Sequence, residues 1–219
     1  MTYEQHTASL VSVTPNAEEN IVYMARVSNP SNQANMETAP RLIKYLIKHK
    51  HWSPFEMASM QVEVNTTRAI AAQVLRHRSF SFQEFSQRYS SVGDLPAIGL
   101  PHLRTQDTKN KQASYDNLDT EVKDRIEREI SRLYANAQDL YEFALERGVA
   151  KECARSILPL GTPTRMYMSG SVRSWIHYIE IRAGIETQLE HRLIAEDCKK
   201  IFVEQFPAIA EAKGWTTAE

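Results

Sequence analysis

The sequence is poor in the residues that build the common phosphate-binding loops and disulfide frameworks. Only seven of its 219 residues are glycine, and none of them is spaced as G-x-G-x-x-G or as a Walker loop. A bound dinucleotide could therefore not rest on a glycine-rich turn, and its phosphates would need side-chain donors. The two cysteines, Cys153 and Cys198, are too few for a disulfide framework and form no CxxC metal pair.

Other absences narrow the class of protein. No apolar run approaches the roughly 20 residues that cross a bilayer, and the first residues lack the basic-then-apolar order of a signal peptide. We therefore expect a cytoplasmic protein with no membrane partner. A net charge of −1 argues against a dedicated nucleic-acid binder, which is usually clearly basic. The length and ordinary composition fit one globular domain, residues 1–219.

Apolar periodicity predicts an α+β fold, a helix-rich domain with a small, largely antiparallel sheet. Alternation with period two predicts strands over 9–14, 60–64 and 164–169. Spacings of three and four residues predict helices over 16–27, 39–50, 66–75, 122–144, 150–157, 171–182 and 187–206. The polar stretches 28–37 and 91–119 are typical of loops.

The densest chemistry lies in the run RHRSFSFQEFSQRYS, which begins at Arg76. Arginine forks match phosphate and carboxylate oxygens two at a time, so the run predicts a site for small phosphorylated molecules. The alternative is a solvated helix face. If the preceding helix continues, Gln73, Arg76, His77 and Glu84 share one face. Glu84 would then hold one arginine in place or accept a hydrogen bond from a sugar hydroxyl.

Further cationic residues lie later in the chain. Arg155 stands in an otherwise apolar segment, where it forms either a structural ion pair or a contact with an anion. Arg173 and His177 are four residues apart on one helix face, whereas Arg182 points to roughly the opposite side. Either this helix serves two ligand groups, or one arginine is a surface residue.

The cysteines and the paired histidines indicate neither a catalytic thiol nor a metal site. Cys153 and Cys198 each lie on a predicted helix among apolar neighbours, the usual setting of an inert buried thiol. His49 and His51 are two residues apart, with no third ligand in register, so we expect no metal. His51, beside Trp52, is expected to line a pocket.

The pattern RHR, followed after seven residues by S-x-R, resembles the signature of the flavin-dependent thymidylate synthases. These are the X-type enzymes, unrelated to the cysteine-dependent kind. The pattern is complete here, from Arg76 to Arg88, and the likeness extends over most of the chain. It includes ARVS at 25–28, HWSPFE at 51–56, the segment around Arg155 and SVRSWIHYIEIR at 171–182. Ser171 and His177 depart from the family pattern, which more often has asparagine at both positions.

The resemblance implies the X-type thymidylate synthase fold and the reductive methylation of dUMP to dTMP. FAD reduced by NADPH would supply the hydride, 5,10-methylenetetrahydrofolate the carbon, and a homotetramer would build each active site from several chains. The implied dUMP contacts are Gln73, Arg76, Glu84, Ser86, Gln87, Arg88, Arg155 and Arg182. The implied FAD contacts are Ser53, Arg76, His77, Arg78, Glu84, Ser171, Arg173 and His177. His51 would lie near the flavin and the folate.

Given this resemblance, the chain must activate the uracil ring without a cysteine adduct. Arg182 is the expected catalytic residue, because a guanidinium near the N3/O2 edge would stabilise the negative charge that develops there. Arg88 and Arg155, with the hydroxyl of Ser86, would grip the nucleotide phosphate.

Two other functions fit parts of the pattern. The run from Arg76 could be a basic and aromatic platform of a nucleic-acid-binding module. Alternatively, the chain could be a related flavoprotein that acts on another nucleotide.

Overall fold

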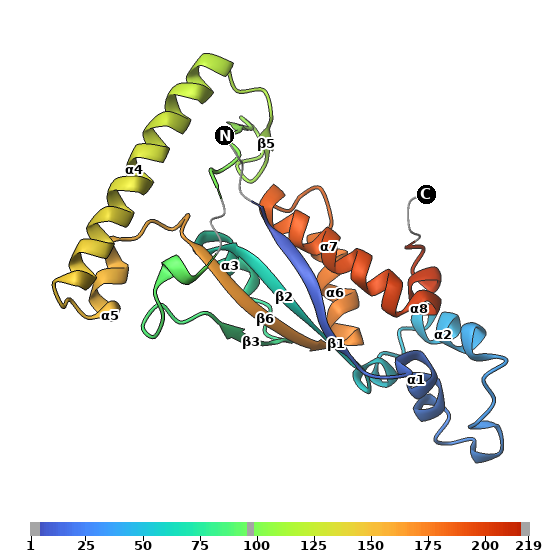
Figure 1. The fold of residues 1–219 in the computed structure, drawn as a ribbon. Coiled ribbons are helices and arrows are strands. Elements are labelled where there is room, and N and C mark those ends of the chain that lie inside the picture. The colour runs from blue at the N-terminus through green and yellow to red at the C-terminus, as the bar shows by residue number, and fades with distance from the viewer. Residues whose placement is uncertain (1–4, 96–98, 216–219) are drawn as a thin grey trace.

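A four-stranded antiparallel sheet forms the centre of the molecule (Figure 1). The computed structural model describes residues 5–95 and 99–215. The order of the strands is β1-β2-β6-β3, with bounds β1 Thr7–Val13, β2 Ser59–Thr67, β6 Pro163–Ser171 and β3 Ser81–Glu84. The predicted α+β class and the antiparallel sheet are confirmed.

One face of this sheet is apolar and buried, as the period-two alternation predicts. Met60, Val62 and Val64 of β2 are fully buried, and Val62 lies opposite Met168 of β6. The helices α6 (Val172–Arg182) and α7 (Leu189–Gln205) contribute buried side chains to the same hydrophobic core. Trp175 of α6 is anchored there because its indole N–H donates to the carbonyl oxygen of Met60 at 2.9 Å. Burying a large apolar side chain contributes about 1.5–3 kcal/mol.

The remaining helices gather at the two ends of the molecule (Figure 1). Helices α1, α2 and α8 lie at one end, and α4 and α5 lie at the other. Their bounds are α1 Ala17–Ala25, α2 Ala39–Lys48, α8 Pro207–Ala212, α4 Thr120–Glu146 and α5 Lys151–Ala154. The other helical segments are α3 Arg68–Val74 and the 3-10 turns η1 Pro30–Asn32, η2 Ser53–Glu56, η3 Val92–Asp94 and η4 Arg155–Ile157.

Three segments differ from the sequence prediction. Residues 81–84 form strand β3 instead of extending a helix, because they pair with 166–169 of β6. The expected loop over 91–119 contains η3 and a hairpin of two short strands, β4 (Thr105–Gln106) and β5 (Ser114–Tyr115). The last predicted helix ends at Gln205, and a separate helix, α8, begins at Pro207, a residue suited to the first helical turn.

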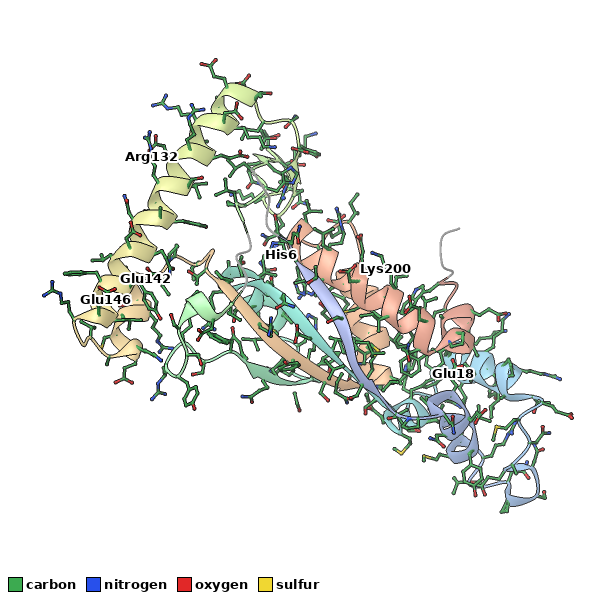
Figure 2. All side chains as sticks on the ribbon, viewed as in Figure 1. His6, Glu18, Arg132, Glu142, Glu146 and Lys200 are labelled. Atoms are coloured by element: carbon green, nitrogen blue, oxygen red, sulfur yellow. The ribbon has the colours of Figure 1, made fainter. Side chains whose placement is uncertain are left out.

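Helix α4 extends away from the sheet, and much of its apolar stripe is exposed (Figure 1). Val122 is 46% exposed, Leu133 59% and Leu140 53%. On its other sides, Arg132, Glu142 and Glu146 reach into solvent (Figure 2). Within residues 5–95 and 99–215, no helix combines the length and apolar character needed to cross a membrane.

Candidate active site

The arginine-rich run is divided by the fold into two parts. Helix α3 ends at Val74, and residues 76–80 form turns in which the amide of His77 donates to the carbonyl of Val74. Strand β3 then carries the chain along β6 to a second turn, in which the amides of Tyr89 and Ser90 donate to the carbonyl of Ser86. The prediction that Gln73, Arg76, His77 and Glu84 share one helix face is therefore wrong.

The first part meets the end of α6 through a direct hydrogen bond. Arg182, the last residue of α6, donates from Nε to Nε2 of His77 at 2.9 Å, although the two are 105 residues apart. Because Nε2 accepts this bond, the imidazole carries its hydrogen on Nδ1. The bond fixes one edge of the guanidinium, and within the described residues its two NH2 groups have no hydrogen-bond partner.

Burial and charge keep His77 neutral. Burial, the Arg182 guanidinium and His177 together lower the pKa of His77 from 6.5 to about 4. An imidazole that is neutral at pH 7 accepts from arginine without repelling it. A charged imidazole at this place would instead push Arg182 away.

Two buried aromatic residues support the His77 ring from behind. Tyr178 packs edge-on against His77, with ring centroids 4.9 Å apart. The hydroxyl of Tyr178 lies 3.2 Å from Nε2 of His191, which is fully buried. Burial, followed by Arg182 and His77, lowers the pKa of His191 to about 3. The two histidines and the tyrosine thus form a neutral, rigid backing for the cationic Arg182.

A pocket of about 450 Å³ opens beside this part of the chain. Its lining comes from η2, the turn after α3 and α6, and comprises Trp52, Glu56, Ser79, Arg173, Ser174, Ile176, His177 and Glu180. Glu56 accepts from Ser171 Oγ at 2.5 Å and from Arg173 Nη1 at 2.9 Å. The structure thus brings together Ser171, Arg173 and His177, three of the residues expected to contact flavin.

Several expected site residues of this region are open to solvent. His51, Ser53, Arg76 and Arg78 are all exposed. Within the described residues, neither Arg76 nor Arg78 has a side-chain hydrogen bond or ion pair. Two exposed guanidiniums without an anion beside them are suited to bind one.

The ion-pair partner of Glu84 differs from the one that the sequence predicts. Its Oε1 accepts from Arg68 Nη1 at 2.5 Å and from Thr164 Oγ1 at 3.0 Å. Its partner is therefore Arg68 of α3 and not an arginine of the run. Arg68 precedes the run, and no local pattern singled it out.

The second part of the run meets the start of α5. A hollow of about 370 Å³ is lined by Ser86, Arg88, Tyr89, Ala150, Lys151 and Glu152. Arg88 lies 3.5 Å from Glu152, in an exposed pair of little energetic weight. Arg155 follows on η4 and is exposed, although its neighbours in the sequence are apolar.

Gln87 is the one buried residue of this second turn. It is only 7% exposed, and its Nε2 has no hydrogen-bond partner in the described chain. Leaving a buried amide group unpaired costs about 1–3 kcal/mol. Such an orphaned donor indicates a partner that comes from outside the chain.

Gln73 belongs to a chain of polar contacts that reaches the β4–β5 hairpin. Its Nε2 donates to Gln188 at 2.6 Å, and Gln188 donates to Glu190 at 2.9 Å. Arg104 donates to both carboxylate oxygens of Glu190, at 2.7 and 3.0 Å. Burial alone would raise the pKa of Glu190, but the hydrogen bonds from Arg104 and Gln188 outweigh it and hold the pKa below its usual value.

The two cysteines have different surroundings. Cys198 is fully buried, and burial raises the pKa of its thiol far above the usual range. Cys153 is exposed on α5, so the expectation that it is buried is wrong. It follows Glu152, which lines the hollow at Arg88.

Comparison with known proteins identifies the family. The family model described as thymidylate synthase complementing protein matches residues 9–208. A probable flavin-dependent thymidylate synthase of Paramecium bursaria Chlorella virus 1 is 55% identical over 217 residues, which is 95% of this chain and 99% of that protein. The chain belongs to the flavin-dependent thymidylate synthase family. The resemblance inferred from the RHR signature is confirmed.

A second relative and a solved structure are also similar to this chain. The flavin-dependent thymidylate synthase of Synechocystis sp. (strain ATCC 27184 / PCC 6803 / Kazusa) is 51% identical over 195 residues, covering 89% of this chain and 88% of that protein. Among solved structures, the UMP/dUMP methylase PolB from Streptomyces cacaoi, bound with 5-Br dUMP, superimposes with a TM-score of 0.83 at 27% identity. That match covers 97% of this chain and 96% of the other.

The family's pattern did not mark every residue that the structure brings to the site. Glu56, which holds Ser171 and Arg173, lies inside the HWSPFE segment and could have been found there. Tyr178 likewise lies inside SVRSWIHYIEIR, whereas His191 lies outside the quoted segments and reaches this group through its contact with Tyr178. Neither the spacing of His191 nor its neighbours in the sequence gives a signal.

Proposed function

We propose that the chain catalyses the reductive methylation of dUMP to dTMP. In this proposal 5,10-methylenetetrahydrofolate donates the carbon and FAD reduced by NADPH donates the hydride, without a cysteine nucleophile. The contact between Arg182 and His77 carries the proposal, because it presents a fixed guanidinium on a neutral support. Such a group stabilises an anion that develops only in the transition state.

The residues around the 450 Å³ pocket suit a flavin. Trp52 and Ile176 offer apolar surface, Arg173 and His177 offer donors for phosphate or ring oxygens, and the volume lies within the usual range for small-molecule pockets. When bound, the flavin supplies the hydride. Ser171 and Arg173, joined through Glu56, would hold its position.

The residues of the second turn suit the nucleotide phosphate. Ser86 and Arg88 are exposed and line the same hollow, and Arg155 is exposed on η4, three residues after Glu152 of its lining. The orphaned amide of Gln87 would gain a partner from the nucleotide or from a second chain. Arg182 would lie at the N3/O2 edge of the base, where its free NH2 groups stabilise the charge formed when C6 accepts the hydride.

The proposal includes a homotetramer in which each active site is built from several chains. Within the described residues, no hydrogen bond or ion pair joins the pocket at Arg173 to the hollow at Arg88. The exposed apolar stripe of α4 offers a surface for another copy, because such stripes are unusual on monomers. Leu133→Glu is expected to dissociate the assembly in analytical ultracentrifugation. Arg128→Glu, on the far side of α4, should not, and a monomeric wild type would contradict the tetramer.

An omission experiment tests the proposed activity. The purified protein is assayed for dTMP with dUMP, methylenetetrahydrofolate, FAD and NADPH, and with each one left out in turn. Product is expected only from the complete mixture, and product formed without flavin would overturn the proposal. UMP deserves a parallel assay, because the S. cacaoi protein is named as a UMP/dUMP methylase.

A further inference from the structure

Helix α2 carries a row of cations on one side. Arg41, Lys44 and Lys48 are spaced by three and four residues, and all three are exposed. At 1.5 Å per residue, the row is about 10 Å long. The opposite side of the helix buries Ile43 and Leu46 in the core. The chain continues the row with Lys50, just beyond the helix end; we call these four residues the α2 basic row.

No residue of the described chain neutralises this row. None of its four side chains forms an ion pair or a hydrogen bond within residues 5–95 and 99–215. The two acidic residues in the adjoining pocket already have partners, since Glu56 binds Arg173 and Glu180 binds Lys213. A line of uncompensated cations attracts a linear anion more strongly than a compact one, because each charge then faces its own partner.

The end of α2 directs the chain from the basic row into the pocket. Lys50 has a φ of 58°, and the amides of Lys50 and His51 donate to the carbonyls of Ile47 and Leu46. This is the helix ending in which glycine is usual, since a side chain at positive φ is strained. A lysine in this strained position, where glycine would be free of strain, indicates that the charge of its side chain has a function. The next residues are His51 and Trp52, and Trp52 lines the 450 Å³ pocket.

Aromatic rings lie among the cations of the row along the same segment of the chain. Tyr45 is 52% exposed. Its ring centroid lies 4.3 Å from that of His49 and 5.9 Å from that of His51. The segment that leads to Trp52 of the pocket thus carries exposed rings and cations side by side. A folate offers a partner for each of these surfaces: a pterin for the cavity, an aryl ring for the exposed rings and a chain of γ-glutamyl carboxylates for the cations.

We propose that the α2 basic row binds the γ-glutamyl tail of the folate co-substrate. The inference rests on the proposed function, because it places the tail of the carbon donor used there. Successive carboxylates would pair with Lys50, Lys48, Lys44 and Arg41. The row is a tail site only, so the pterin and the chemistry do not depend on it.

The test compares folates with one and with five γ-glutamyl residues. For the wild type, the KM of the pentaglutamate form is expected to be lower. Each exposed ion pair changes an affinity by roughly 1.5- to 5-fold. Lys44→Gln combined with Lys48→Gln should therefore raise the KM of the pentaglutamate by roughly 2- to 30-fold. The KM of the monoglutamate and kcat should stay unchanged.

A matched control removes two lysines elsewhere. Lys109 and Lys111 are exposed in the turn of the β4–β5 hairpin, and Lys109→Gln combined with Lys111→Gln removes the same charge. This variant should keep the wild-type preference for the pentaglutamate. Added salt should reduce that preference in the wild type, as expected for exposed charges.

The other outcomes overturn the inference. Equal KM values for the two folates in an active wild type would refute the tail site and leave the proposed function intact. A rise in the KM of NADPH alone in the Lys44 and Lys48 variant would assign the row to that co-substrate's phosphate. Binding of single-stranded oligonucleotide, lost in the same variant without any change in folate kinetics, would assign it to nucleic acid. No dTMP from either folate would refute the proposed function itself.

Discussion

His191 is expected to make the fold sensitive to acid. It is fully buried, and burial with nearby Arg182 and His77 lowers its pKa to about 3 in the folded chain. An unfolded chain exposes the imidazole, whose pKa then returns to about 6.5. Between these values only the unfolded state binds the proton, so the free energy of unfolding falls as the pH falls from about 6.5 toward 3. The stability is fully present above pH 6.5.

The size of this effect follows from the two pKa values. Between pH 7 and pH 5, a histidine that shifts from 6.5 to about 3 lowers the free energy of unfolding by about 2 kcal/mol. His191→Gln removes the titration and keeps a polar group for the hydroxyl of Tyr178. The variant should therefore lose about 2 kcal/mol less than the wild type over this interval.

Denaturant unfolding at pH 7 and pH 5 measures this difference directly. His49→Gln, which removes an exposed histidine, serves as the control and should behave like the wild type. His77 adds a similar fall to every protein in the comparison, since its pKa is also lowered, to about 4. If His191→Gln and the wild type lose the same stability, the buried neutral histidine is not the cause.

Three further predictions concern single residues. Gly170→Ala would place a Cβ 2.5 Å from the ring of Phe80. We therefore expect the free energy of unfolding, followed by thermal unfolding, to fall by about 1–3 kcal/mol and flavin binding to weaken. Unchanged stability would contradict the close packing. Gln87→Met removes the amide that has no partner. The variant should stabilise the free protein by about 1 kcal/mol or more and weaken dUMP binding. A destabilised variant would show that the amide has a partner. Cys153→Ala should keep its activity although the thiol is exposed, and an inactive variant that still folds and binds flavin would count against the cysteine-free route.

The sequence predicted those strands and helices whose apolar residues recur with a clear period, because that period shows which face is buried. Strands β2 and β6 alternate because one sheet face is buried, and the helix over Thr120–Glu146 has an unbroken period. Strand β3 was missed because its four residues pair with β6 from more than 80 positions away. Gly148 ends α4 with a φ of 82°, as its position predicts.

The sequence predicted which residues belong to the candidate site, but it did not predict which of them contact one another. The family resemblance named His77 and Arg182, yet their hydrogen bond exists only because α6 returns beside the turn after α3. Periodicity placed Glu84 on a helix, because a four-residue strand is too short to show its own period. The apolar neighbours of Arg155 did not reveal that η4 leaves this residue exposed.

The proposed catalysis depends most on the guanidinium of Arg182, which a neutral His77 holds in place. The most direct test is the single-turnover rate of dTMP formation by Arg182→Ala loaded with reduced flavin, with and without added guanidinium ion. Loss of a transition-state donor predicts a rate lower by about 100- to 1000-fold, with a much smaller change in the Kd of dUMP. Added guanidinium should restore part of the rate. An unchanged rate, or a loss confined to dUMP affinity, would contradict the role given to Arg182.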